Sequence, residues 1–103
     1  MKYNPQIVVA FFKEHGLTAI PEYRFCPERR WRADFYFEPD ILLECDGGLF
    51  IAGGGRHNRG ASMLKDFEKL NRAACMGFRV LRVTPQSLCM QDTIEMIREA
   101  LND

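Results

Sequence analysis

The sequence lacks a net charge, a close pair of cysteines and a long apolar run. Its 14 basic and 14 acidic residues give a formal net charge of zero, so overall charge gives no argument for a nucleic-acid partner. The four cysteines form no CxxC or CxH pair, which argues against a zinc site or a disulfide framework and favours reduced thiols. No apolar run reaches the roughly 18 residues of a membrane span. These absences indicate a cytoplasmic protein without a membrane segment.

The composition is that of an ordinary globular protein. Hydrophobic residues make up 47% and charged residues 27% of the 103 positions, which suits one domain over 1–103 and fits an enzyme as well as a binding module. The basic residues are unevenly placed, because eleven of the 14 lie between Arg24 and Arg82. A local basic surface is therefore compatible with the neutral total.

Helix caps, turn residues and hydrophobic periodicity predict an α/β protein. Asn4 and Pro5 are typical of a helix start, and Gly16 and Gly77 are typical helix stops. The order is α-β-β-β-α-β-α, with a mixed four-stranded sheet flanked by helices. The expected elements are a helix over 5–15, strands over 20–25, 31–37 and 41–46, a glycine-rich loop over 47–60, a helix over 61–77, a strand over 78–85 and a helix over 92–101.

Glu44 and Asp46 end a strand that is otherwise apolar. They share a face, because side chains alternate along a strand. A turn centred near Pro39 makes the numbers of cross-strand partners sum to about 78, so Asp34 faces Glu44 and Arg32 faces Asp46. The opposite face then packs into the core through Ala33, Phe35, Phe37, Ile41, Leu43 and Cys45.

Carboxylates this close repel one another unless a cation lies between them. One interpretation is a shared Mg²⁺, which prefers oxygen ligands and retained water. The other is a solvated sheet face with salt bridges to Arg32 and Arg24. The Pro39-Asp40 dipeptide is excluded from the site, because Asp40 lies about 13 Å along the strand from Glu44.

The helix over 61–77 is expected to face the core through Met63, Phe67, Leu70 and Ala74. Beside this stripe, an edge formed by Ser62, Asp66, Lys69 and Ala73 would let Lys69 lean over the polar sheet face. The alternative for Lys69 is a solvated surface charge.

The loop GGLFIAGGGRHNRG lacks the GxxxxGK[ST] pattern of a phosphate-binding P-loop. Its glycines would let it approach a nucleic-acid backbone, with Arg56 and Arg59 meeting phosphates. The turn before the second strand offers further arginines around Trp31, namely Arg29, Arg30 and Arg32. These arginines either bind DNA or form a solvated face. Trp31 either stacks on a base or holds the hairpin against the core.

Four segments together resemble a known family: EYRFCPERRWRADFYF, ECDGG, GRHNRG and DFEKLNRAACMGFRVLRVTP. They are similar to small phage and prophage nucleases of the PD-(D/E)XK superfamily, related to Holliday-junction resolvases and very-short-patch repair endonucleases. The resemblance covers about residues 5–86 and implies the restriction-endonuclease-like core, an acid on the second strand and an acid-x-acid/Lys motif on the third.

The resemblance implies roles for individual residues. Asp34 and Glu44 match the metal-binding acids, and Glu22 matches the extra glutamate of resolvase-like members. Position 46 departs from the pattern, because Asp46 stands where the usual lysine is expected, and Lys69 is then the natural replacement. His57 is either an acid/base or phosphate ligand or a loop histidine without a role.

The expected protein is a Mg²⁺-dependent DNA endonuclease, with Mn²⁺ as an alternative ion, acting in bacterial or phage-infected cytoplasm. Its Mg²⁺ would be surrounded by Glu22, Asp34, Glu44 and Asp46, with Lys69 and His57 assisting. Its substrate would be branched or otherwise structured DNA in phage DNA processing, and resolvase-like relatives usually act as homodimers. Two rivals stay open: a non-catalytic nucleic-acid-binding module on a nuclease fold, and a purely structural phage or host-interaction protein.

Overall fold

The structure, a computed structural model, describes residues 3–46 and 59–102, without the side chains of 59–62. The expected order of elements and the α/β class are confirmed, with every observed boundary within two residues of the expected one. Arg59 and Gly60 begin a helix and so do not belong to the loop expected over 47–60, whose other residues lie outside the described part. The elements are α1 (Pro5–Glu14), β1 (Ile20–Arg24), β2 (Arg32–Phe37), β3 (Ile41–Cys45), α2 (Arg59–Cys75), β4 (Arg79–Val83) and α3 (Gln91–Leu101).

Local chemistry explains where the helices begin and end. The Asn4 side chain accepts a hydrogen bond from the backbone N–H of Gln6 at 2.9 Å, which caps the start of α1. Gly16 after α1 and Gly77 after α2 have φ angles of +78° and +94°. These left-handed values favour glycine, because a Cβ would be strained there. No helix in the described ranges is long and apolar enough to cross a membrane.

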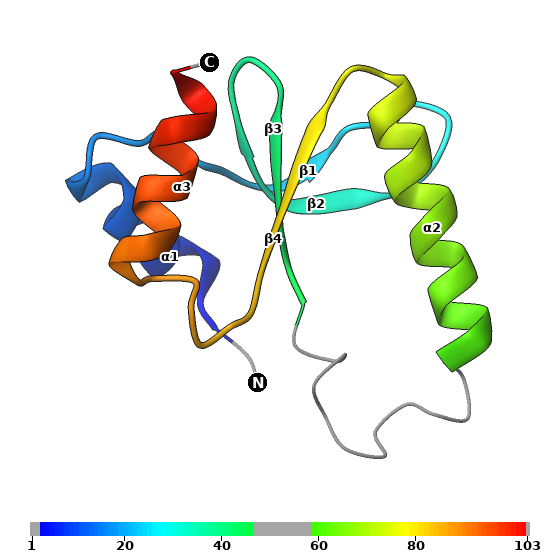
Figure 1. The fold of residues 1–103 in the computed structure, drawn as a ribbon, viewed down its shortest axis with the longest axis horizontal. Coiled ribbons are helices and arrows are strands. Elements are labelled where there is room, and N and C mark those ends of the chain that lie inside the picture. Colours follow the sequence, from blue (N-terminus) through cyan, green and yellow to red (C-terminus); the bar gives the residue numbers. More distant parts are fainter. Residues whose placement is uncertain (1–2, 47–58, 103) are drawn as a thin grey trace.

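The four strands form one mixed sheet in the order β1-β2-β3-β4 (Figure 1). The first three strands are antiparallel neighbours, whereas β4 runs parallel to β3 after the chain crosses over through α2. The β2–β3 partners are Phe35 with Leu43, Tyr36 with Leu42 and Phe37 with Ile41. These numbers sum to 78, so the predicted register is confirmed.

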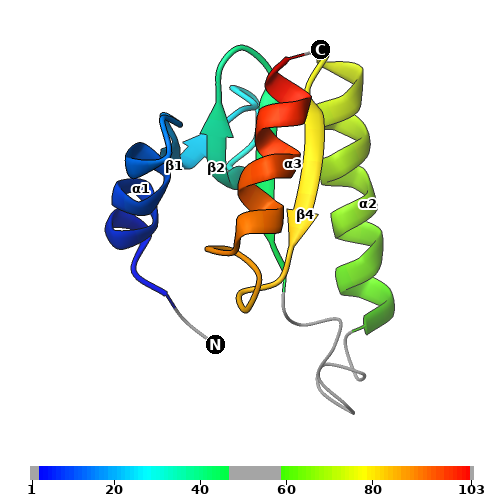
Figure 2. The same cartoon turned by 60° about the vertical axis from the view of Figure 1, so that its left-hand side comes forward.

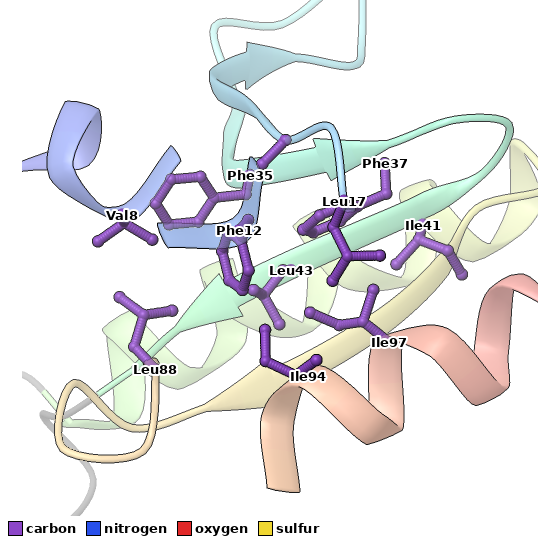
Figure 3. Packing of buried hydrophobic residues seen from close by; sticks show 11 residues of the cluster. Val8, Phe12, Leu17, Phe35, Phe37, Ile41, Leu43, Leu88, Ile94 and Ile97 are labelled. Carbon is purple, nitrogen blue, oxygen red and sulfur yellow. The ribbon is translucent and has the colours of Figure 1, made fainter. Parts of the chain in front are cut away.

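Helices cover both faces of the sheet. Helices α1 and α3 lie on one face and α2 lies on the other (Figures 1 and 2). The larger apolar cluster fills the space between the sheet and the α1–α3 layer, and Figure 3 shows its side chains converging from both. Its fully buried members include Phe12, Phe35, Phe37, Ile41, Leu43, Ile94 and Ile97.

A second apolar cluster corrects the expectation that only one sheet face packs into a core. It lies toward α2 and contains Phe25, Cys26, Ala33, Leu42 and Ala73. Ala33 was expected in the other cluster with Phe35. The second cluster exists because Leu42 points away from the first and is fully covered, at 1% exposure. The polar surface is therefore confined to the part of this face beyond the cluster.

The orientation of α2 also differs from the expected one. Met63 and Phe67 were expected to face the core but are 38% and 52% exposed, and Ala74 is also exposed. The residue that packs on the sheet is Ala73, which is fully buried. A small side chain there lets the helix approach Leu42 closely, and the helix is thereby turned so that Lys69 faces the sheet.

Candidate active site

The site begins where the β2–β3 ladder stops. The last pair in this ladder is Phe35 with Leu43. Beyond it, side chains replace the backbone as partners: the Asp34 N–H donates to Glu44 Oε2 at 3.2 Å, and the Cys45 N–H donates to Asp34 Oδ2 at 2.7 Å. The two carboxylates thus satisfy backbone donors that the separating strands would leave unpaired. Both acids are held in place by the fold itself.

Lys69 reaches the same point from α2. Its Nζ lies 2.7 Å from Glu44 Oε1, and the two side chains are only 21% and 15% exposed. The predicted placement of Lys69 over the polar sheet face is confirmed, and the alternative of a freely solvated lysine is wrong. Its catalytic role stays a prediction. The half-buried pair is screened less by solvent than a surface ion pair.

The environment of Glu44 disfavours its own negative charge. Burial raises the pKa of the Glu44 carboxyl above its ordinary value. The hydrogen bond and charge of Lys69 lower it, the charge of Asp34 raises it, and the Asp34 N–H lowers it again, leaving a net increase. Burial, more than the charge of Asp34, therefore causes the increase, and a further cation beside Glu44 would favour its ionised form.

Tyr3 is a neighbour of this site that the sequence did not indicate. Its ring packs against Phe35, with the ring centroids 6.0 Å apart. Burial, followed by the charge of Asp34, raises the pKa of Tyr3 well above its ordinary value, and a hydrogen bond with Asp34 adds to the increase. Tyr3 therefore stays a neutral phenol beside Asp34. Nothing in the spacing of the sequence places it there.

Asp46 lies at the end of β3 next to β4. Its N–H donates to the Val83 carbonyl at 2.8 Å, and its carboxylate forms an ion pair with Arg82. Arg82 was not expected at the site; it is the β4 partner of Glu44 in the parallel ladder. Arg32, which was expected to face Asp46, forms an exposed ion pair with Glu22 at 3.9 Å. The fourth strand thus supplies a cation that a hairpin register alone does not predict.

Glu22 lies in the same row of the sheet. Continuing the β1–β2 register places it opposite Asp34, since Pro21 pairs with Phe35 and Tyr23 with Ala33. Its φ angle is +50°, an uncommon value for a residue with a Cβ that costs about 1–3 kcal/mol. Backbone strain of this kind clusters at functional sites, which supports the expectation that Glu22 belongs to this one.

Two hollows flank Lys69. One has a volume of about 170 Å³ and is lined by Glu44, Cys45, Asp46, Asp66, Lys69, Leu70 and Arg82. The other has a volume of about 330 Å³ and is lined by Glu22, Arg30, Trp31, Arg32, Ala33, Asp34 and Lys69. The expected acids and Lys69 are therefore brought together, and Asp66 joins them as an acid that was not chosen from the sequence.

The arginines divide into those beside the acids and those elsewhere. Arg30 and Arg32 line the larger hollow together with Asp34. Arg29 points to α2, where its Nη1 lies 3.0 Å from Glu68. Arg56 and His57 lie outside the described residues, and Arg59 begins α2 without a described side chain. Asp40 is paired with Arg79 at 2.9 Å, consistent with its exclusion from the site.

The donor atoms at the site suit a hard cation. The side chains gathered from β1, β2 and β3 are carboxylates, the ligand type that Mg²⁺ prefers. The Cys45 thiol is a poor competitor, because burial and the charges of Asp34 and Asp46 raise its pKa to about 11. Among the residues described, no group of three acids, histidines or cysteines is arranged to hold a metal ion. A site with one or two carboxylates and water is the arrangement that fits.

No protein-family model, curated protein or solved structure matches the chain.

Proposed function

We propose that this protein is a Mg²⁺-dependent DNA endonuclease of the PD-(D/E)XK type. The observation that carries the proposal is the joining of Asp34 and Glu44 across the end of the β2–β3 ladder, with Lys69 on Glu44. Placing two half-buried carboxylates side by side costs free energy of desolvation and mutual repulsion, beyond what pairing two backbone N–H groups requires. A site that binds a divalent cation, and through it a phosphate, accounts for that cost.

The proposed roles follow from position. Asp34 and Glu44 would hold Mg²⁺ together with water, with Asp46 and Glu22 at the edge of the site. When bound, the ion would supply charge stabilisation and a more acidic water. Lys69 would orient the attacking water or hold the phosphate, because its ammonium already lies among the acids. Arg30 and Arg32 would bind the flanking phosphates, and their hollow also contains Asp34.

One observation favours the rival, a DNA-binding module without catalysis. Lys69 already forms an ion pair with Glu44, and no three-ligand group is preformed in the part of the chain that the structure describes. In that case Lys69 replaces the metal permanently, and the acids serve only to fix the strands. Such a protein would bind DNA equally well with and without Mg²⁺.

A nuclease assay separates the two. The protein is incubated with branched, nicked, mismatched and linear DNA in Mg²⁺, in Mn²⁺ and in chelator. The enzyme proposal expects cleavage of at least one substrate that stops in chelator. Binding without cleavage of any substrate in either ion would favour the module, and absence of both would leave neither standing.

A further inference from the structure

A hollow between the β1–β2 turn and α2 shares Trp31 with the hollow beside Asp34. Its volume is about 270 Å³, and it is lined by Cys26, Glu28, Arg29, Trp31, Glu68 and Arg72. Trp31 is the residue common to this hollow and to the larger one that contains Asp34 and Lys69. A ligand that contacts the indole of Trp31 in the hollow beside α2 therefore lies next to the candidate active site.

The indole of Trp31 packs against Phe25 and the second apolar cluster, and the guanidinium of Arg29 lies over its ring. Its ring is nearly parallel to Phe25, at an interplanar angle of 20° and 6.4 Å between centroids, and packs on the second apolar cluster. The Arg29 guanidinium lies 4.0 Å from the Trp31 ring centroid. Its ion pair with Glu68 is about half exposed on both sides, and such pairs contribute little. Moving Arg29 away from the indole would therefore cost little free energy. A flat group could then stack on the indole, or on the exposed face of the Arg29 guanidinium.

The charges of the lining residues differ between the two hollows and favour different ligands. Two glutamates and two arginines line the hollow between the turn and α2, so it has no excess charge to attract phosphate. It offers an aromatic face and both donors and acceptors at the rim, which suits a flat, neutral heterocycle. The hollow beside Asp34 carries three cations, Arg30, Arg32 and Lys69, against two acids. Although Arg32 and Lys69 also pair with Glu22 and Glu44, this hollow suits a phosphate better than the neutral hollow beside Trp31 does.

We propose that Trp31 and Arg29 form a stacking subsite for an unpaired nucleobase of the DNA strand. The inference rests on the proposed function, because it assigns the substrate of the same site. Trp31 precedes Asp34 by three residues, about 10 Å of extended chain, so the base belongs to a nucleotide near the phosphate to be cut. A base inside an intact duplex is already stacked on its neighbours. The substrate class is therefore DNA with an unpaired base, rather than plain duplex.

The wild-type chain provides the test, because Trp31 is its single tryptophan. The protein is titrated in chelator with an oligothymidylate, with an abasic strand of equal length and charge, and with a blunt duplex. Trp31 emission reports stacking, and the anisotropy of labelled DNA reports binding. We expect oligothymidylate to quench Trp31 and to bind about tenfold or more tightly than the abasic strand. Equal quenching and affinity with the abasic strand, unchanged emission at saturation, or no binding would overturn the proposal.

Variants separate stacking from a purely structural role. Trp31→Leu should abolish the preference for oligothymidylate over the abasic strand, whereas Trp31→Phe should keep most of it. The control is Phe67→Leu, which removes an exposed aromatic of α2 outside both hollows and should change nothing. If Trp31→Leu weakens binding of both strands equally, Trp31 only supports the turn and the subsite is refuted. Cleavage is measured separately in Mg²⁺: a base preference without cleavage refutes the nuclease alone, and cleavage without a base preference refutes the subsite alone.

Discussion

Asp34 and Glu44 lie opposite one another where strands β2 and β3 stop pairing, and each takes part in holding the other's strand. The Asp34 N–H donates to the Glu44 carboxylate, while the Asp34 carboxylate accepts from the N–H that follows Glu44. Each acid is thereby fixed by a backbone group of the neighbouring strand. The fold therefore holds two carboxylates in fixed positions beside one lysine.

Replacing Glu44 by glutamine should abolish cleavage and remove the contribution of Glu44 to the pH dependence of stability. The pKa of Glu44 is raised in the folded state, so the native state holds its proton more tightly than the unfolded chain. Its contribution to stability is full below the unfolded pKa and is lost as the pH rises through the folded one. The free energy of unfolding of Glu44→Gln minus that of wild type should therefore increase from pH 4 to pH 7, measured by urea unfolding in chelator. Glu68→Gln, on an exposed pair, is the matched control. A difference that stays constant or decreases over this pH range would contradict the raised pKa of Glu44.

Replacing Lys69, with Lys65 as the control, tests whether Lys69 is catalytic. Lys69 touches Glu44, whereas Lys65 is exposed one turn earlier on the same helix. Lys69→Ala should slow cleavage by about a hundredfold or more, the scale of losing one positioned charge at a reacting group. Lys65→Ala should leave the rate within about twofold of wild type. Small and equal effects in single-turnover assays would return Lys69 to a structural role.

Replacing Glu22 by glycine should increase stability and decrease activity. Glycine adopts a φ of +50° without strain, so Glu22→Gly should raise the free energy of unfolding by about 1 kcal/mol. Glu22→Gln keeps the strained backbone and loses only the charge, so it should bring no such gain. Both variants should cut DNA more slowly if the carboxylate takes part in the site. Faster or unchanged cleavage by both would remove Glu22 from it.

The orientation of α2 can be checked without any activity assay. Ala73 is fully buried against the sheet, and Ala74 is exposed. Ala73→Leu should overpack the second apolar cluster and destabilise the fold by about 1–3 kcal/mol. Ala74→Leu should change stability by about 0.5 kcal/mol or less. The reverse order in urea unfolding would mean that the stripe of Met63 and Phe67 faces the sheet after all.

The salt dependence of DNA binding tests the basic wall of the larger hollow. Arg30 and Arg32 line it beside Asp34. Replacing both by glutamine should reduce the log–log salt slope by about two, roughly one for each phosphate contact. The control replaces Lys13 and Arg98, which belong to α1 and α3 on the other face of the sheet. A slope that changes equally in both variants would place the DNA elsewhere.

The sequence predicts the sheet well because its signals there are local. Alternation along β2, and the two acids that end β3, leave one register that buries Phe35 and Leu43 and places the acids together, and the observed pairs follow it. The same register places Asp34 beside Glu44. Lys69 follows from helical spacing once α2 is placed over the sheet.

The sequence-based predictions are wrong where the packing of one element on another determines the structure. The apolar stripe of α2 was expected to face the sheet, but Ala73 permits a closer approach over Leu42, and Lys69 gains Glu44. Tyr3 and Arg82 reach the site from segments distant in sequence. Arg82 becomes the neighbour of Glu44 only through the parallel β3–β4 pairing, which no local pattern specifies.

The central claim is that Asp34 and its neighbours cleave DNA, and the rate of a single variant tests it most directly. Asp34→Asn keeps the size of the side chain and an oxygen acceptor for the Cys45 N–H, but removes the charge. Single-turnover cleavage of the preferred DNA in Mg²⁺ is compared with wild type, after far-UV circular dichroism has shown equal folding. We predict a rate at least about a hundredfold lower for the variant. A rate within about twofold of wild type, from a pure and folded sample, would contradict the account.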